Sequence, residues 1–66
     1  MKIRVNGEEQ VLDGVATLAD LIAVLELAGK RVAIEKNGEI VPRSRHGEER
    51  LSDGDELEIV VAVGGG

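Results

Sequence analysis

The sequence predicts an α+β domain with one main helix packed on one face of a four- or five-stranded mixed sheet. Several short segments alternate apolar and polar residues, the period-2 pattern of half-buried strands. One segment, starting at Thr17, instead repeats its apolar residues at helical spacing. Asn-Gly and Asp-Gly pairs separate these segments and favour tight turns. At 66 residues the chain has room for one such core.

The N-terminal segment is expected to form a hairpin. Ile3 and Val5 alternate with polar neighbours in the first strand, and residues 9–12 form the second. Asn6-Gly7 is expected to connect them, because both residues tolerate positive φ.

The predicted helix begins at Thr17, whose hydroxyl can accept a hydrogen bond from an exposed backbone N–H. Asp20 adds negative charge to the first turn. The apolar stripe falls at positions i, i+3, i+4 and i+7: Leu18, Leu21, Ile22 and Leu25. Gly29 is expected to end the helix in a left-handed conformation.

The C-terminal half is expected to supply three more strands. Its segments are a strand from residue 32 to a turn at 37–38, a short strand at 40–41, a polar surface loop at 43–50 and a turn at 52–55. Pro42 ends the short strand or confines it to an edge. Leu57, Ile59 and Val61 alternate along the last strand and are expected to face the helix.

This order of elements matches the β-grasp, or ubiquitin-like, fold best. In that fold the first and last strands lie side by side in the centre of the sheet. We expect residues 1–63 to form the domain and residues 64–66 a flexible glycine tail.

Composition excludes several classes of function. A net charge of −5 and the lack of Phe, Trp and Tyr argue against nucleic acid as a partner. Without Cys there is neither a disulfide nor a cysteine nucleophile, and no motif indicates a metal site or a bound cofactor. No segment is long and apolar enough for a signal peptide or a membrane span, so a cytoplasmic location is the default.

The tail is the most informative segment. Gly64 and Gly65 lack side chains and can thread into a narrow partner channel, while Gly66 would present a free carboxylate. An activated carboxylate is an electrophile that sulfur or an amine can attack. The alternative is a frayed end without a role.

Together with the tail, several stretches resemble the sulfur carriers of thiamin biosynthesis, the ThiS family. They are 5–8 (VNGE), 17–22 (TLADLI), 37–44 (NGEIVPRS), 51–55 (LSDGD) and 58–66 (EIVVAVGGG). The related small subunit of molybdopterin synthase shares the fold and a diglycine end, but it is usually longer and lacks the Val-Pro-Arg run.

The resemblance implies a carrier that is not itself an enzyme. An adenylating, ThiF-type activating enzyme would use ATP to activate the Gly66 carboxylate. A persulfide sulfur, from a donor such as a cysteine desulfurase, would then give a thiocarboxylate, and a ThiG-type thiazole synthase would receive the sulfur. A molybdopterin-type carrier and a protein modifier that forms isopeptide bonds remain alternatives.

Other candidate sites are few. Val60, Ala62 and Val63 could form an apolar docking patch for the activating enzyme on the face away from the helix, or could simply be good strand formers. The only histidine, His46, is expected to be exposed and without function, with a contact to a partner as the alternative. The carboxylates at 48–49 are expected to form a solvated charge run.

Overall fold

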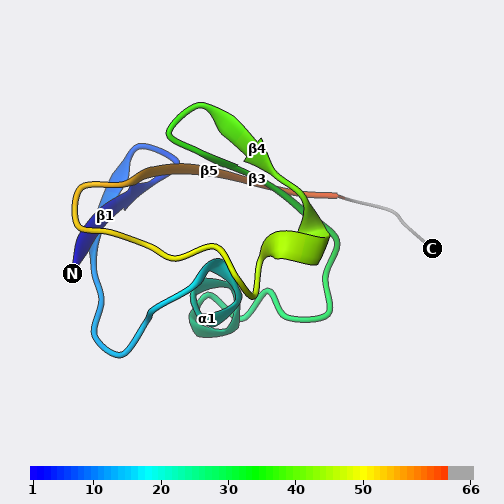
Figure 1. Ribbon diagram of the computed structural model, residues 1–66, viewed down its shortest axis with the longest axis horizontal. Coiled ribbons are helices and arrows are strands. Elements are labelled where there is room, and N and C mark those ends of the chain that lie inside the picture. Colours follow the sequence, from blue (N-terminus) through cyan, green and yellow to red (C-terminus); the bar gives the residue numbers. More distant parts are fainter. Residues whose placement is uncertain (63–66) are drawn as a thin grey trace.

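The computed structural model describes residues 1–62, which form a single sheet with one α-helix across one face (Figure 1). The elements are β1 (Lys2–Val5), β2 (Glu8–Val11), α1 (Leu18–Val24), β3 (Val32–Lys36), β4 (Glu39–Val41), the 3₁₀ helix η1 (Arg43–Arg45) and β5 (Glu56–Val61). The predicted boundary between domain and tail, after residue 63, lies outside the described residues.

The sheet has five strands in the order β2-β1-β5-β3-β4. Its central pair, β1 and β5, is parallel, while β1–β2, β3–β4 and β3–β5 are antiparallel. The first and last strands therefore lie side by side, as predicted. The α+β class and the β-grasp arrangement are confirmed.

Both Asn-Gly pairs form the predicted tight turns. Asn6 and Gly7 have φ values of 51° and 83°, and Asn37 and Gly38 have 51° and 85°. Positive φ at both central residues is the geometry that continues the right-handed twist of the flanking strands. The first turn pairs Val5 with Glu8, so β2 spans Glu8–Val11, one residue earlier than predicted.

The core lies between the helix and the sheet. Leu18 and Leu21 are fully buried, and Ile22 and Leu25 pack partly buried against them, which confirms the predicted stripe. The buried apolar side chains are Ile3, Val5, Val15, Leu18, Leu21, Ile34, Val41, Leu51, Leu57 and Ile59. Val61 lies on the same face of β5 as Ile59 but is 36% exposed.

The helix begins at the predicted residue with a capping box. The Asp20 N–H donates to Thr17 Oγ1 at 3.3 Å, and the Asp20 carboxylate accepts from the backbone N–H groups of Ala16 at 2.9 Å and Thr17 at 3.1 Å. These hydrogen bonds, that from Ala16 first, lower the pKa of Asp20. The sequence signal at Thr17 is thus confirmed as the helix start.

The predicted helix end was wrong. The helix stops at Val24, and Glu26 takes the left-handed position that ends it, with φ of 60°. Gly29 is also left-handed, with φ of 83°, but lies beyond the end of the helix. The Glu26 N–H donates to Ala23 O at 3.1 Å and the Leu27 N–H to Ile22 O at 2.9 Å, the two bonds of a Schellman motif. Leu27 and Ile22 both pack against the core, so apolar contact fixes the end at a residue that is not glycine.

Glu26→Gly is expected to stabilise the fold. A left-handed conformation strains a residue with a Cβ, and removing that strain outweighs the extra chain entropy of glycine by about 0.5–1 kcal/mol. Thermal unfolding should show a rise of several degrees. Glu26→Ala is the matched control, because it removes the carboxylate and keeps the Cβ. If Glu26→Ala raised the unfolding temperature as much as Glu26→Gly, the explanation by backbone strain would be contradicted.

Candidate functional site

The predicted docking residues that the structure describes lie on the face of the sheet away from the helix. Leu57 and Ile59 of β5 are buried, whereas Val60 between two inward positions is 63% exposed and Ala62 is also exposed. The alternation along a strand places Val60 on the opposite face from Ile59. Their role in docking a partner stays a prediction.

The neighbouring strands add two residues that the sequence analysis did not select. Ala33 lies directly opposite Val60 in the β3–β5 register. Ile40 lies opposite Glu35 on β4 and is 77% exposed. We call Ala33, Ile40, Val60 and Ala62 the open-face patch. One sequence signal pointed to Ile40: it is adjacent to Val41, and two consecutive strand residues cannot face the same core.

The chain is paired with the sheet up to its last described residue. The Ala62 N–H donates to Arg31 O at 2.9 Å, just beyond the end of β5. Val63 and the glycines at 64–66 lie outside the described residues, so their roles in docking, threading and attachment stay predictions. Of the open-face patch, Val60 and Ala62 are close to them in sequence.

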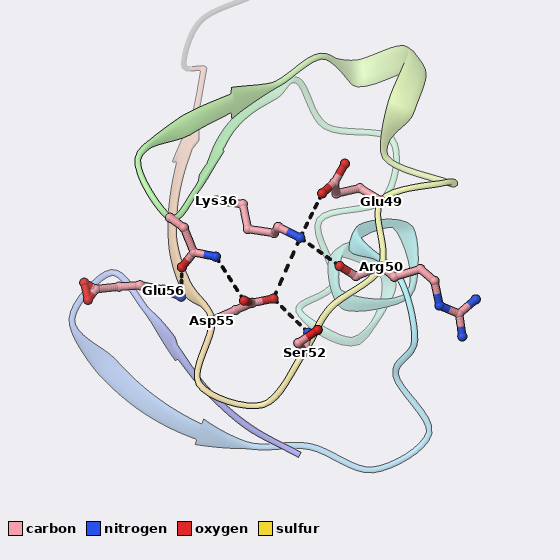
Figure 2. A network of polar contacts seen from close by, with 7 residues as sticks. Lys36, Glu49, Arg50, Ser52, Asp55 and Glu56 are labelled. Atoms are coloured by element: carbon pink, nitrogen blue, oxygen red, sulfur yellow. Dashed lines mark hydrogen bonds and ion pairs between the residues drawn. The ribbon is translucent and has the colours of Figure 1, made fainter.

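A polar network is centred on Lys36, the last residue of β3, on the side of the sheet that faces the helix (Figure 2). The Lys36 ammonium lies 2.8 Å from a Glu49 carboxylate oxygen and donates to Arg50 O at 2.9 Å. An Asp55 carboxylate oxygen lies 3.9 Å from the same nitrogen. Because the Lys36 side chain is only 19% exposed, these contacts replace most of its hydration.

Asp55 is the second member of this network and is itself buried. Its carboxylate accepts from Asn37 Nδ2 at 3.0 Å and from the Ser52 N–H at 2.8 Å. The Asn37 side-chain oxygen in turn accepts from the Glu56 N–H at 2.9 Å. The network therefore ties the β3–β4 turn to the start of β5.

Two predictions for the 43–50 segment were wrong in part. The segment is anchored, because Leu18 N–H donates to Glu49 O at 3.0 Å and Ala19 N–H to His46 O at 3.0 Å. Glu49 was expected in a solvated charge run, but its side chain is only 27% exposed and pairs with Lys36. Glu48 is exposed, as expected.

His46 was expected to be exposed, and that prediction was wrong. The residue is 6% exposed, and its Nε2 lies 3.1 Å from Val41 O. Since a carbonyl oxygen only accepts, Nε2 carries the proton of this hydrogen bond. The 3₁₀ helix after Pro42 turns the chain back toward β4 and brings the ring to that carbonyl. The ring is thus a structural contact.

Within residues 1–62 no group of three or more His, Cys, Asp or Glu residues is placed to hold a metal ion. The same described stretch has no helix with the length and apolarity required to cross a bilayer. The Asp53-Gly54 region forms the predicted turn, with Gly54 at φ of 89°.

Comparison with known proteins identifies the family. A model of the ThiS family matches residues 3–66, nearly the whole chain. The chain belongs to the ThiS family. It is 38% identical over 65 residues to the sulfur carrier protein ThiS of Bacillus subtilis, covering 97% of this chain and 98% of that protein. The crystal structure of the thiamine biosynthesis protein ThiS from Geobacter metallireducens superposes with a TM-score of 0.83 at 32% identity, covering all of both chains.

A second kind of relative is much longer. The thiazole synthase of Paramagnetospirillum magneticum is 42% identical over all 66 residues of this chain. The chain spans only 20% of that protein's length. In this relative, a region similar to the whole of this chain is therefore part of a larger polypeptide described as a thiazole synthase.

Lys36→Met is expected to destabilise the fold by about 1–2 kcal/mol at neutral pH, because the Arg50 carbonyl and two carboxylates lose their cation. The hydrogen bond with Glu49 raises the pKa of Lys36 above its ordinary value of 10.5. A raised folded-state pKa gives stability that is complete below the unfolded-state pKa and lost as pH rises through the folded-state pKa.

The measurement is thermal unfolding of both proteins between pH 7 and strongly alkaline pH. The difference in unfolding midpoint between the wild type and Lys36→Met should be constant up to about pH 10 and shrink above that pH. Lys30→Met, at an exposed lysine, is the control. A gap that persists when Lys36 is deprotonated would show that methionine fails for steric reasons instead.

Proposed function

We propose that this chain is a cytoplasmic sulfur carrier for the formation of the thiamin thiazole ring. The observation that carries the proposal is the extent of the family match, which continues from the folded domain through Gly66. The match thus includes the three glycines as well as the sheet. The chain and the Bacillus carrier match over nearly the full length of both, which supports the same function.

In this proposal the Gly66 carboxylate is the only reacting group that the chain contributes. A carboxylate oxygen attacks the α-phosphorus of ATP in the activating enzyme, pyrophosphate leaves, and a glycyl adenylate forms. The terminal sulfur of a persulfide attacks the acyl carbon and AMP leaves, which gives an acyl disulfide. A thiol of a partner enzyme then attacks the donor's sulfur in the S–S bond, so the thiocarboxylate leaves and a disulfide forms between that thiol and the donor. No cysteine exists in the sequence to hold sulfur by another route.

The partners supply every other group. A ThiF-type enzyme binds ATP, a cysteine desulfurase or a similar enzyme supplies the persulfide, and a ThiG-type thiazole synthase receives the sulfur. The thiazole synthase is the partner with the most direct support, because the Paramagnetospirillum protein of that name contains a region similar to this whole chain. Gly64 and Gly65 are proposed to thread into the partner active sites, where side chains would not fit.

The open-face patch is proposed as the docking surface for the activating enzyme. Its described members Val60, Ile40, Ala33 and Ala62 are exposed and share one face of the sheet. Val63 is proposed as a further member. Exposed apolar side chains that share one face of a sheet are typical of a protein contact.

Val60→Asp is expected to weaken activation without unfolding the domain. Val60 is 63% exposed, so the change in unfolding free energy should stay within about 0.5 kcal/mol. The patch would, however, bury an unpaired carboxylate against the enzyme, which costs several kcal/mol. ATP–pyrophosphate exchange with the ThiF-type enzyme should show a raised KM for the carrier. Val24→Asp, at a valine that is 53% exposed on the helix, is the control.

Deletion of Gly66 is expected to leave the fold intact and to abolish most adenylation. The deletion draws the carboxylate back by about 3.3–3.6 Å. A misplacement of only about 1 Å from a reacting centre can lower a rate on the order of a hundredfold. Pyrophosphate exchange measures the loss, and circular dichroism checks the fold. Adding one residue after Gly66 should also abolish loading, because the reacting group becomes an amide.

Intact mass measurement of the native protein from its own cell tests the function directly. A fraction heavier by the exchange of one oxygen for one sulfur is expected, and it should be missing after the Gly66 deletion. Sulfur loading of either tail variant at the normal rate would contradict attachment at Gly66. Conjugates of higher mass with other proteins would instead identify a ubiquitin-like modifier.

A further inference from the structure

One hydrogen bond attaches the chain to the sheet beyond the last residue of β5. The Ala62 N–H donates to Arg31 O at 2.9 Å. The β3–β5 register pairs Val61 with Val32, so Ala62 and Arg31 lie directly opposite each other. Ala62 is also the last residue that the structure describes. We call this contact the Ala62–Arg31 bond. It is the final attachment of β5 to β3 within residues 1–62.

The hydrogen bonds that precede it between β5 and β3 lie two residues earlier. Residue pairs in an antiparallel ladder alternate between those that exchange hydrogen bonds and those that do not. Since Ala62 bonds the β3 side, Val60 does as well and Val61 does not. Ile59 agrees with this alternation, because its N–H and C=O bond the Asn6 side chain on the β1 side. Loss of the Ala62–Arg31 bond therefore detaches two residues from β3.

The acceptor of this bond is held by a turn that follows the helix. The Lys30 N–H donates to Leu27 O at 3.0 Å and closes a turn directly before Arg31. Gly29, the third residue of that turn, has φ of 83°, the sign that a type II turn requires there. Leu27 packs against the core. The position of Arg31 O thus depends on the connection between the helix and β3.

The Ala62–Arg31 bond defines the length of chain between the sheet and the reacting carboxylate. Four residues follow Ala62 in the sequence. At about 3.3–3.6 Å per extended residue, they place the Gly66 carboxylate at most about 13–14 Å from Ala62. Without the bond the count starts at Val60, and six residues span at most about 20–22 Å. One hydrogen bond therefore decides between two reaches of the same chain.

We propose that the Ala62–Arg31 bond fixes the distance over which the Gly66 carboxylate enters the activating enzyme, so that Ala62 and Arg31 are positioning residues for adenylation. The inference rests on the proposed function. With the bond in place, the chain up to Ala62 is ordered before the enzyme binds. Each further residue that must be ordered in the complex lowers an equilibrium constant by a factor of roughly 5–30. The bond removes that cost for two residues.

An amide-to-ester replacement at position 62 tests the bond without changing a side chain. An ester oxygen takes the place of the Ala62 N–H, so the donor is lost and the open-face patch is kept. A chain of 66 residues is short enough for chemical synthesis. The kcat/KM for the carrier in pyrophosphate exchange should fall roughly five- to thirtyfold.

The matched control is the same replacement at Leu12. The Leu12 N–H donates to Met1 O at 2.8 Å, just beyond the end of β2. This bond also closes a strand end, but it lies at the N-terminal end of the sheet, away from the glycine end (Figure 1). The control should lower the midpoint of thermal unfolding by a similar amount and leave pyrophosphate exchange near the wild-type rate.

Deletion of Val63 in the amide and ester chains tests reach itself. The deletion keeps all three glycines and draws the carboxylate back by one residue. With the Ala62–Arg31 bond intact, kcat should fall on the order of a hundredfold. In the ester chain the detached residues supply the missing length, so the same deletion should lower kcat less than about tenfold. A merely structural role of the bond gives no such rescue.

Equal losses from the Val63 deletion in both chains would overturn the proposal, because reach would then not be measured from Ala62. An unchanged kcat/KM in the Ala62 ester would also overturn it. A loss in the Leu12 ester as large as that in the Ala62 ester would assign the effect to stability. If the wild-type chain supports no exchange, the carrier function itself fails. That outcome differs from a wild-type chain that exchanges normally while the rescue is missing.

Discussion

The fold depends on the pairing of β5 with strands on both of its sides. The β1–β2 hairpin and the β3–β4 hairpin have no ladder with each other, and β5 joins them through a parallel pair and an antiparallel pair. The parallel side is short, and the Asn6 side chain extends it. Its Nδ2 donates to Ile59 O at 3.0 Å, and its oxygen accepts from the Ile59 N–H at 2.8 Å. A side-chain amide thus takes the place of one more residue of β1.

The same device occurs on the other side of β5, where Asn37 bonds Asp55 and Glu56. Asn-Gly is usually treated as a local turn signal, because both residues tolerate positive φ. In this chain each asparagine also makes a long-range contact to the central strand. Each turn therefore fixes the register of a hairpin and attaches that hairpin to β5, which is also the strand that leads to the glycine end.

Local chemistry made most of the fold predictable. Strand alternation, the two Asn-Gly turns and the capping signal at Thr17 each act within a few residues, and each was correct. The errors come from packing and side-chain contacts that the local patterns do not signal. The helix ends at Val24 where Leu27 packs against the core, and the His46 ring is buried in a hydrogen bond with the carbonyl of Val41. At the candidate site, period-2 alternation placed Val60 outward. It could not bring Ala33 and Glu35 beside β5, because that depends on which strands become neighbours.

The open face follows from the number of helices. Residues 1–62 form one α-helix, and it covers only one face of the sheet. Every inward position near the helix serves the core, so substitutions there act first on stability. Outward positions contribute little to that core, and selection for a partner can act on them almost independently. A sheet without a partner favours polar outward residues and avoids like charges opposite each other. Val60 is an exposed apolar residue, and Glu35 lies opposite Glu58 in the β3–β5 register. Such departures from local consistency are expected where a surface serves binding instead of folding.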